Sequence, residues 1–329
     1  MTYVELHCHS FFSFREGAST PLELILTARE MGYDAIALTD HDGLAGSMDF
    51  AQSARQWGIR GIIGAELTLR DGLGCVDGEG DGGAGTAGGV GGGTPHLTVL
   101  APPHLTVLAE TQPGYANISR MISRAHCNSP RGEPTLDPRE LLSSGAGIVA
   151  LSGCRQSEVA RLAAEEEMGA ACEAAGRYAD LFGRESFFIE LQDNYVRGDR
   201  ARNRALIEIA RRVGVGVVAT NNVHYHTRLR HRLQDVLVAT RHHSTLDASE
   251  RVRRPNAEFY LKPPEEMERL FAEIPEAIAN TRAIAERCRF DLTRDLTYRF
   301  PGFTPPENWR MVHHRDTEGT EGTEEFSGS

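Results

Sequence analysis

Residues 5–14 read ELHCHSFFSF and place His7 and His9 two positions apart, directly after a short apolar run. We predict that this run, residues 3–6, is a buried β-strand, because apolar runs of this kind are typical of strands in parallel sheets. Side chains two positions apart in a strand point to the same face, so both imidazoles can reach one ion above the strand's end. The pair alone only weakly indicates a metal site. The prediction becomes stronger when the residues at the ends of the other strands are considered.

Short apolar runs alternate with amphipathic helical patterns along most of the chain, which predicts βα units around a parallel sheet. Further strands are expected at 35–39, 61–67, 105–108, 148–151, 187–191 and 215–220, and helices at 21–31, 44–57, 113–125, 158–182 and 200–213. The fold class is therefore α/β, as a closed or nearly closed barrel of seven strands, with a doubly wound open sheet as the alternative. Polar residues at many different strand ends favour a barrel mouth.

The bulk composition limits the classes of function. The chain has 329 residues and a formal net charge of −11, which argues against a protein that coats nucleic acid through bulk electrostatics. Its six cysteines show no CxxC spacing, and the N-terminus has neither a basic region nor a long apolar run. We predict a cytoplasmic protein with reduced thiols, no membrane span and only local contacts with DNA.

Two stretches interrupt the pattern of strands and helices. Residues 71–94 are rich in glycine and predict a flexible surface insertion. The heptapeptide PHLTVLA then occurs twice, from Pro95 and from Pro103, and we place His104 of the second copy in the fold and His96 in the loop. Residues 296–329 begin as a linker and become a repetitive acidic tail, which predicts disorder. The abrupt change suggests a reading frame that ended early, by frameshift or truncation.

Candidate metal ligands lie at the ends of most of the expected strands. They are Asp40 and His41 in LTDHDG, Glu66 in GAEL, His104, Cys154 in LSGC, and Asn222 and His224 in ATNNVHYH. A carboxylate buried among histidines is costly unless it is paired or binds a cation. Imidazole and carboxylate ligands with one thiolate suit Zn²⁺, Mn²⁺ or Fe, and a shared glutamate suggests a cluster of several ions.

Several ordered motifs together resemble the N-terminal PHP (polymerase and histidinol phosphatase) domain of bacterial DNA polymerase III alpha subunits, above all the error-prone ones. They are ELHCHSFFSFREGAS, ALTDHDGLAGSMDFAQSARQWGIRGIIGAELTL, GYANISRMISRAH, ALSGCRQSEVARL, ATNNVHYH and RPNAEFYLKPPEEM, and the match covers roughly residues 1–301 apart from the glycine-rich insertion. The resemblance implies a distorted (βα)₇ TIM-like barrel with up to three divalent metals at its mouth. It places a PHP domain over residues 1–295, of which 225–295 form a helical extension.

The resemblance also implies a ligand set for each metal. His7, His9, Glu66 and Asn222 would surround the first, Glu66, His104 and Cys154 the second, and Glu16, His41 and His224 the third, while Asp40 would orient the ring of His7 or His41. Two positions depart from the family pattern. Glu16 stands where active members carry Asp, which is a mild change, whereas Asn222 replaces an Asp and removes an anion from the first site.

For function, the resemblance implies metal-dependent phosphoester hydrolysis on DNA or nucleotide phosphates, in the manner of a 3′–5′ exonuclease. A purely structural role beside the polymerase core and other replication subunits is equally compatible with it. The palm, fingers and thumb that perform nucleotidyl transfer in the family have no counterpart in this sequence. The alternatives are a stand-alone phosphoesterase of the histidinol-phosphatase or nuclease kind and a non-catalytic interaction module; Asn222 favours the latter.

Overall fold

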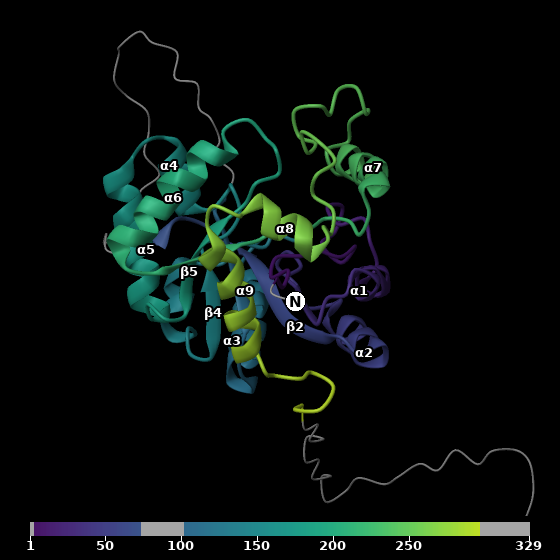
Figure 1. Cartoon of the computed structure of the whole chain (residues 1–329), viewed down its shortest axis with the longest axis horizontal. Helices are drawn as coiled ribbons and strands as arrows, with labels where there is room; N and C mark the ends of the chain where they lie inside the picture. Colours follow the sequence, from purple (N-terminus) through teal and green to yellow (C-terminus); the bar gives the residue numbers. More distant parts are fainter. Residues whose placement is uncertain (1–2, 74–101, 297–329) are drawn as a thin grey trace, which may run out of the picture. The chain divides into compact units, whose positions relative to one another are not determined.

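The apolar runs predicted as strands form one curved sheet at the centre of the molecule (Figure 1). In the computed structural model, which describes residues 3–73 and 102–296, its strands are β1 (Ala35–Leu38), β2 (Arg60–Thr68), β3 (His104–Ala109), β4 (Ile148–Leu151), β5 (Phe187–Leu191) and β6 (Gly216–Ala219). Each strand pairs with the next one along the chain. Most of the glycine-rich insertion, His96 and all but the first residue of the predicted 296–329 tail segment lie outside the described residues.

The N-terminal segment joins the two edges of this sheet but is not a regular strand. Glu5 bridges Ile36 of β1, and Cys8 bridges Val223, which follows β6. Side chains accept hydrogen bonds from backbone amides of this segment: the amide of His7 donates to Glu5 Oε1, and that of Cys8 to Thr39 Oγ1. The strand predicted at residues 3–6 is therefore reduced to single bridges, and the α/β distorted barrel is confirmed.

One strand runs against the expected direction. β3 is antiparallel to both β2 and β4, whereas the other pairs are parallel. The all-parallel prediction was wrong here because apolar patterning marks a strand without recording its direction. The reversal matters for the site, since it pairs His104, the first residue of β3, with Thr68 at the end of β2.

The predicted helices are present in the described part of the chain, with one break. They are α1 (Pro21–Glu30), α2 (Ser47–Trp57), α3 (Gln112–Cys127), α4 (Glu158–Ala164), α5 (Met168–Phe182) and α6 (Asp199–Val213). At α1, Thr20 caps the helix and forms a capping box with Glu23, and Pro21 is the first residue of the helix. The single helix expected at 158–182 is divided because Glu166 adopts a left-handed conformation, with φ of 63°.

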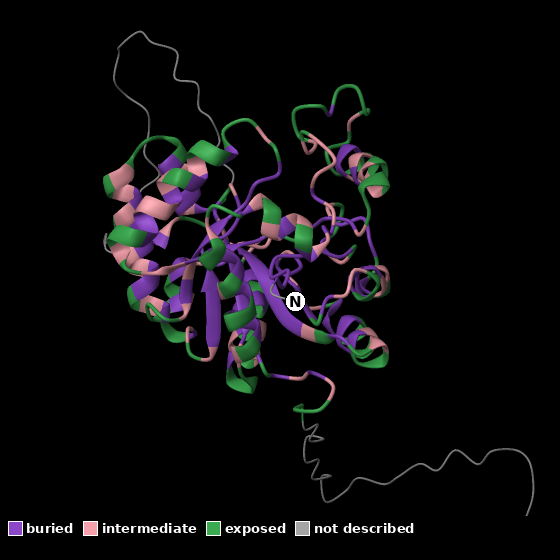
Figure 2. Cartoon of the chain, in the orientation of Figure 1, coloured by how far each residue is buried: buried purple, intermediate pink, exposed green. Residues whose placement is uncertain are grey.

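After β6 the chain continues in a helical segment with α7 (His231–Arg241), α8 (Pro264–Leu270) and α9 (Pro275–Arg287). Asn280 in α9 donates a hydrogen bond to the carbonyl of Val217 in β6, and Thr281 accepts one from the amide of Val4. Helix α9 therefore packs directly on the barrel. In Figure 2 the buried residues follow the sheet, while the outer faces of the helices are exposed.

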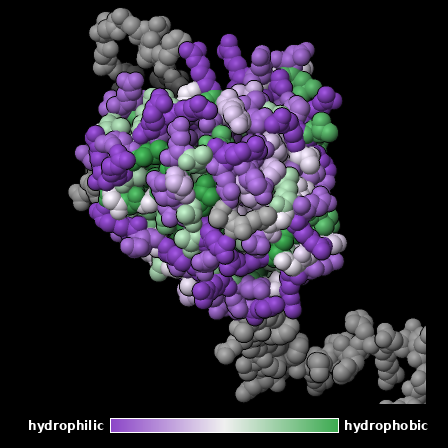
Figure 3. Space-filling model, in the orientation of Figure 1, coloured by the Kyte–Doolittle hydropathy of each residue, from purple (hydrophilic) through white to green (hydrophobic). Residues whose placement is uncertain are grey.

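The face shown in Figure 3 is largely hydrophilic, and its hydrophobic residues occur in scattered groups. Within the described residues, no helix is both long enough and apolar enough to cross a bilayer.

Candidate metal centre

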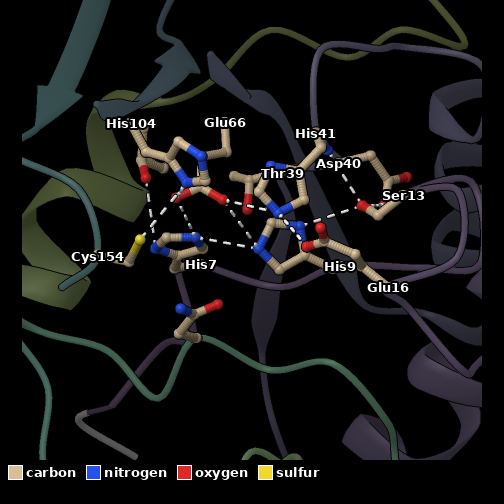
Figure 4. Close-up of polar contacts among 12 residues, drawn as sticks. His7, His9, Ser13, Glu16, Thr39, Asp40, His41, Glu66, His104 and Cys154 are labelled. Carbon is tan, nitrogen blue, oxygen red and sulfur yellow. Dashed lines mark hydrogen bonds and ion pairs between the residues drawn. The ribbon is translucent and has the colours of Figure 1, made fainter. Parts of the chain in front are cut away.

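The two histidines of the opening motif lie side by side at the mouth of the barrel, fully buried (Figure 4). His7 Nδ1 lies 2.6 Å from Glu190 Oε1, and His9 Nδ1 lies 3.1 Å from Ser13 Oγ. Each ring can therefore donate through Nδ1 and present the lone pair of Nε2 to the centre of the site. The two Nε2 atoms are 3.1 Å apart.

Two nitrogen lone pairs at this separation repel each other unless a cation lies between them or one nitrogen carries a proton. Burial opposes a charge on His7, but the carboxylates of Glu190 and Glu66 outweigh it and raise the pKa of His7 well above its ordinary value. Burial and the neighbouring His41 hold the pKa of His9 well below its own. The two rings therefore favour one positive charge between their Nε2 atoms. A metal ion bound there would displace the proton that His7 otherwise carries.

Glu66, on β2, is the carboxylate on which the imidazoles converge. Its oxygens lie 3.5 Å from Nε2 of both His7 and His9, 3.1 Å from His41 Nε2 and 3.2 Å from His104 Nδ1. Burial would raise the pKa of Glu66, but His41, His104 and His7 hold it well below its ordinary value. Although His104 Nδ1 lies 3.2 Å away, no described residue forms a hydrogen bond of good geometry with the buried Oε1, which fits an atom whose ligand is a cation.

Within residues 3–73 and 102–296, two groups of side chains have the spacing of a metal site. They are His7, His9 and Glu66, and His41, Glu66 and His104; in each group the candidate ligand atoms lie within 4.8 Å of one another. Glu66 belongs to both, as expected for a shared carboxylate. Nitrogen and carboxylate donors of this kind fit a pair of divalent ions.

Cys154 lies at the edge of the second group. Its Sγ is 3.6 Å from His104 Nδ1. Gly153, with φ of 93°, makes this approach possible, because a Cβ there would lie 2.5 Å from the carbonyl oxygen of His104. Burial raises the pKa of the Cys154 thiol, so a thiolate at this position would need a bound cation.

The residues expected to hold a third ion are only partly brought together. Glu16 Oε2 lies 2.9 Å from His41 Nε2, so these two meet. His224 stacks on His9 with ring centroids 4.5 Å apart, and its Nε2 is 2.9 Å from Asn222 Oδ1. That nitrogen also contacts the guanidinium of Arg254.

Among the described residues, Asp40 forms no hydrogen bond with a histidine ring, so the role predicted for it toward His7 or His41 would have to be indirect. Its carboxylate accepts hydrogen bonds from the Ser10 amide, the Ser10 hydroxyl and the Ser13 hydroxyl. Ser13 Oγ in turn faces His9 Nδ1. Asp40 thus positions His9 through Ser13, because a short loop brings the serine between the carboxylate and the ring.

Sequence reasoning missed two residues of this site. Glu190, in the middle of the β5 pattern FFIEL, holds His7 Nδ1 and also accepts a hydrogen bond from Gln192. The signal was a glutamate inside an apolar strand, which needs a partner when buried. Arg254 belongs to the basic run RVRRP at residues 251–255, a pattern typical of a solvated surface, but the structure turns its guanidinium toward His224.

Known proteins similar to this chain were found by family, by structure and by sequence. The PHP domain family matches residues 5–194 of the chain. An amidohydrolase structure from Chromobacterium violaceum, solved with bound sulfate, covers 68% of this chain and 87% of its own at 16% identity and a TM-score of 0.40.

Proteins that share a higher sequence identity with this chain than the solved structure does are long and are named error-prone DNA polymerase. The one from Symbiobacterium thermophilum is 38% identical over 324 residues, covering 93% of this chain and 27% of the relative. The one from Mycobacterium tuberculosis is 36% identical over 309 residues, covering 93% and 26%. This chain thus spans about a quarter of the length of these relatives, and it belongs to the PHP domain family.

Proposed function

We propose that the cluster around Glu66 binds divalent metal ions and that the site hydrolyses phosphoesters. The observation that carries this proposal is the pair of buried Nε2 atoms of His7 and His9, 3.1 Å apart and each within 3.5 Å of the Glu66 carboxylate. A buried arrangement of this kind has no structural advantage without a cation, since apolar side chains of similar volume would fill the barrel more cheaply.

Two groups of ligands support the assignment of individual residues. We place one ion at His7, His9 and Glu66, with the amide oxygen of Asn222 as a neutral candidate ligand. A second ion would be held by Glu66, His104 and His41, with Cys154 within reach. The mixed nitrogen, oxygen and sulfur set suits Zn²⁺, Mn²⁺ or Fe²⁺ better than Mg²⁺ or Ca²⁺, which prefer oxygen ligands.

When bound, such ions lower the pKa of a coordinated water toward neutrality and neutralise phosphoryl oxygens. The chain's own residues prepare the site for them. Glu190 and Ser13 fix His7 and His9 through their Nδ1 atoms, so that both Nε2 lone pairs face inward. Burial excludes bulk water around Glu66 and strengthens each electrostatic interaction there.

At the level of the whole protein, we propose that the chain is the PHP region of an error-prone DNA polymerase III alpha subunit. The substrate would then be DNA or a nucleotide phosphate, processed as by a 3′–5′ exonuclease, and the partners the polymerase core and other replication subunits, in the cytoplasm. The similarity to proteins named error-prone DNA polymerase over 93% of the chain supports this reading. We set the domain boundary after residue 295, with 225–295 as its helical extension, which the compact unit of residues 1–296 supports.

A non-catalytic structural module is the second candidate. The observation in its favour is the neutral Asn222, whose Oδ1 faces His224 Nε2 where the family pattern has a carboxylate. A stand-alone phosphoesterase is less favoured, because the relatives of higher identity are much longer polymerases.

The test is metal analysis of the purified protein together with hydrolysis of a nitrophenyl phosphate ester and of 3′-ended single-stranded DNA. We expect bound divalent metal and hydrolysis in the wild type, and loss of both in His9→Ala. His242→Ala is the matched control, because His242 is exposed on the segment after α7. Metal content without hydrolysis would favour the structural module, and hydrolysis unchanged in His9→Ala would refute the site.

A further inference from the structure

The ring of His224 is turned toward an arginine. Nη2 of Arg254 contacts His224 Nε2 and lies 3.3 Å from Nδ1. A guanidinium has donors only, so a neutral His224 interacts with it through the nitrogen lone pair, whichever tautomer is present. That lone pair is the one a metal would require.

The carboxylate of Glu16 also contacts an arginine. Its Oε2 faces His41, while its Oε1 forms an ion pair with Nη1 of Arg241, the last residue of α7. Glu16 and His224, the two residues expected to hold a third ion beside His41, are therefore each engaged by a guanidinium. Both arginines come from the segment that follows β6.

Arg254 is held in place by its surroundings. Its guanidinium carbon lies 4.6 Å from the centroid of the Phe259 ring, a cation–π contact. No residue in the described part of the chain forms a hydrogen bond with its buried Nε. A guanidinium remains protonated at neutral pH. A permanent cation thus lies against His224, whose Nε2 also faces the neutral amide of Asn222.

We propose that the guanidinium groups of Arg254 and Arg241 take the place of a third metal ion, so that the chain binds at most two. A divalent ion at His224 and Glu16 would have to displace Arg254 from the His224 lone pair, and its charge would repel both guanidinium groups. The amide of Asn222 offers no negative charge to offset that repulsion. The inference rests on the proposed metal centre at Glu66, and it concerns the number of ions rather than their presence.

The experiment measures bound metal in the full chain after equilibration with excess Mn²⁺ and removal of free ions, by elemental analysis per mole of protein. We expect no more than two equivalents in the wild type and one further equivalent in the double variant Arg241→Met, Arg254→Met. Arg251→Met is the matched control, since Arg251 belongs to the same basic run but is exposed. Substitution with Co²⁺ gives a second readout, because added visible absorption in the double variant reports a newly coordinated ion.

Three bound ions in the wild type would overturn the proposal while leaving the metal centre intact. An unchanged number of ions in a folded double variant would overturn it as well. No bound metal in either protein would refute the metal centre itself, and the proposal with it. Circular dichroism establishes that the variants are folded, and the pair Arg241→Gln, Arg254→Gln replaces the methionine variant if that one does not fold.

Discussion

Glu190→Gln tests whether a residue that contacts a candidate ligand, but not the metal itself, strengthens metal binding. Glu190 Oε1 lies 2.6 Å from His7 Nδ1, and both side chains are fully buried. Glutamine keeps the volume and one acceptor oxygen, so His7 retains its orientation, but the negative charge that makes the imidazole a stronger ligand is lost. Substitutions of such outer partners weaken metal binding by about 10- to 100-fold.

This loss has a calculable effect on stability. At a metal concentration of about 100 times the wild-type Kd, binding adds about 2.7 kcal/mol to the free energy of unfolding. A tenfold weaker site would gain about 1.4 kcal/mol under the same conditions, and a hundredfold weaker one about 0.4 kcal/mol. We therefore expect the metal-dependent increase in stability to fall by about half or more in Glu190→Gln.

The assay is urea unfolding of wild type and variant with and without Mn²⁺ or Zn²⁺, together with competition against a fluorescent chelator. Glu208→Gln on α6 is the control, because that carboxylate pairs only with surface arginines of the same helix in the described structure. A Glu190→Gln protein that binds metal as tightly as the wild type would show that the charge behind His7 has no part in the site.

Glu66→Gln should weaken metal binding by more than about 100-fold, since a shared ligand matters more than an outer partner; chelator competition measures it, and unchanged affinity would contradict its bridging position. Gly64→Ala should lower the free energy of unfolding by about 1–3 kcal/mol, because the new Cβ would lie 2.3 Å from the carbonyl oxygen of Val107. Gly176→Ala in α5, where the Cβ meets open space, should instead add about 0.5–1 kcal/mol in the same urea titration. Thr20→Ala should cost about 1 kcal/mol through the lost cap of α1, and equal stability would show that the cap is dispensable.

Several features of the fold follow from local sequence alone. The capping box at Thr20 and the apolar run of β1 specify their elements because the signals lie within a few residues of each other. Polar residues at the ends of apolar strands also predicted that His7, His9, Glu66 and His104 would lie close together, and all four belong to the two groups whose spacing could hold a metal. Spacing within a strand determines on which face a side chain lies.

Other features depended on contacts between distant segments. The direction of β3 and the reduction of the first strand to single bridges are set by pairing across the sheet and by competing side-chain hydrogen bonds, which no local pattern records. The same holds for Glu190 behind His7 and for Arg254 beside His224, which are 183 and 30 residues away from their partners in sequence.

The sequence by itself thus determined which kinds of ligand are present and that they lie at the mouth of the barrel, because strand periodicity and residue chemistry are local properties. Only the tertiary structure decided which atoms face one another, and with them the balance of charge at Glu66, Glu16 and His224. That balance depends on distances of a few ångströms between segments that the chain brings together only when it folds.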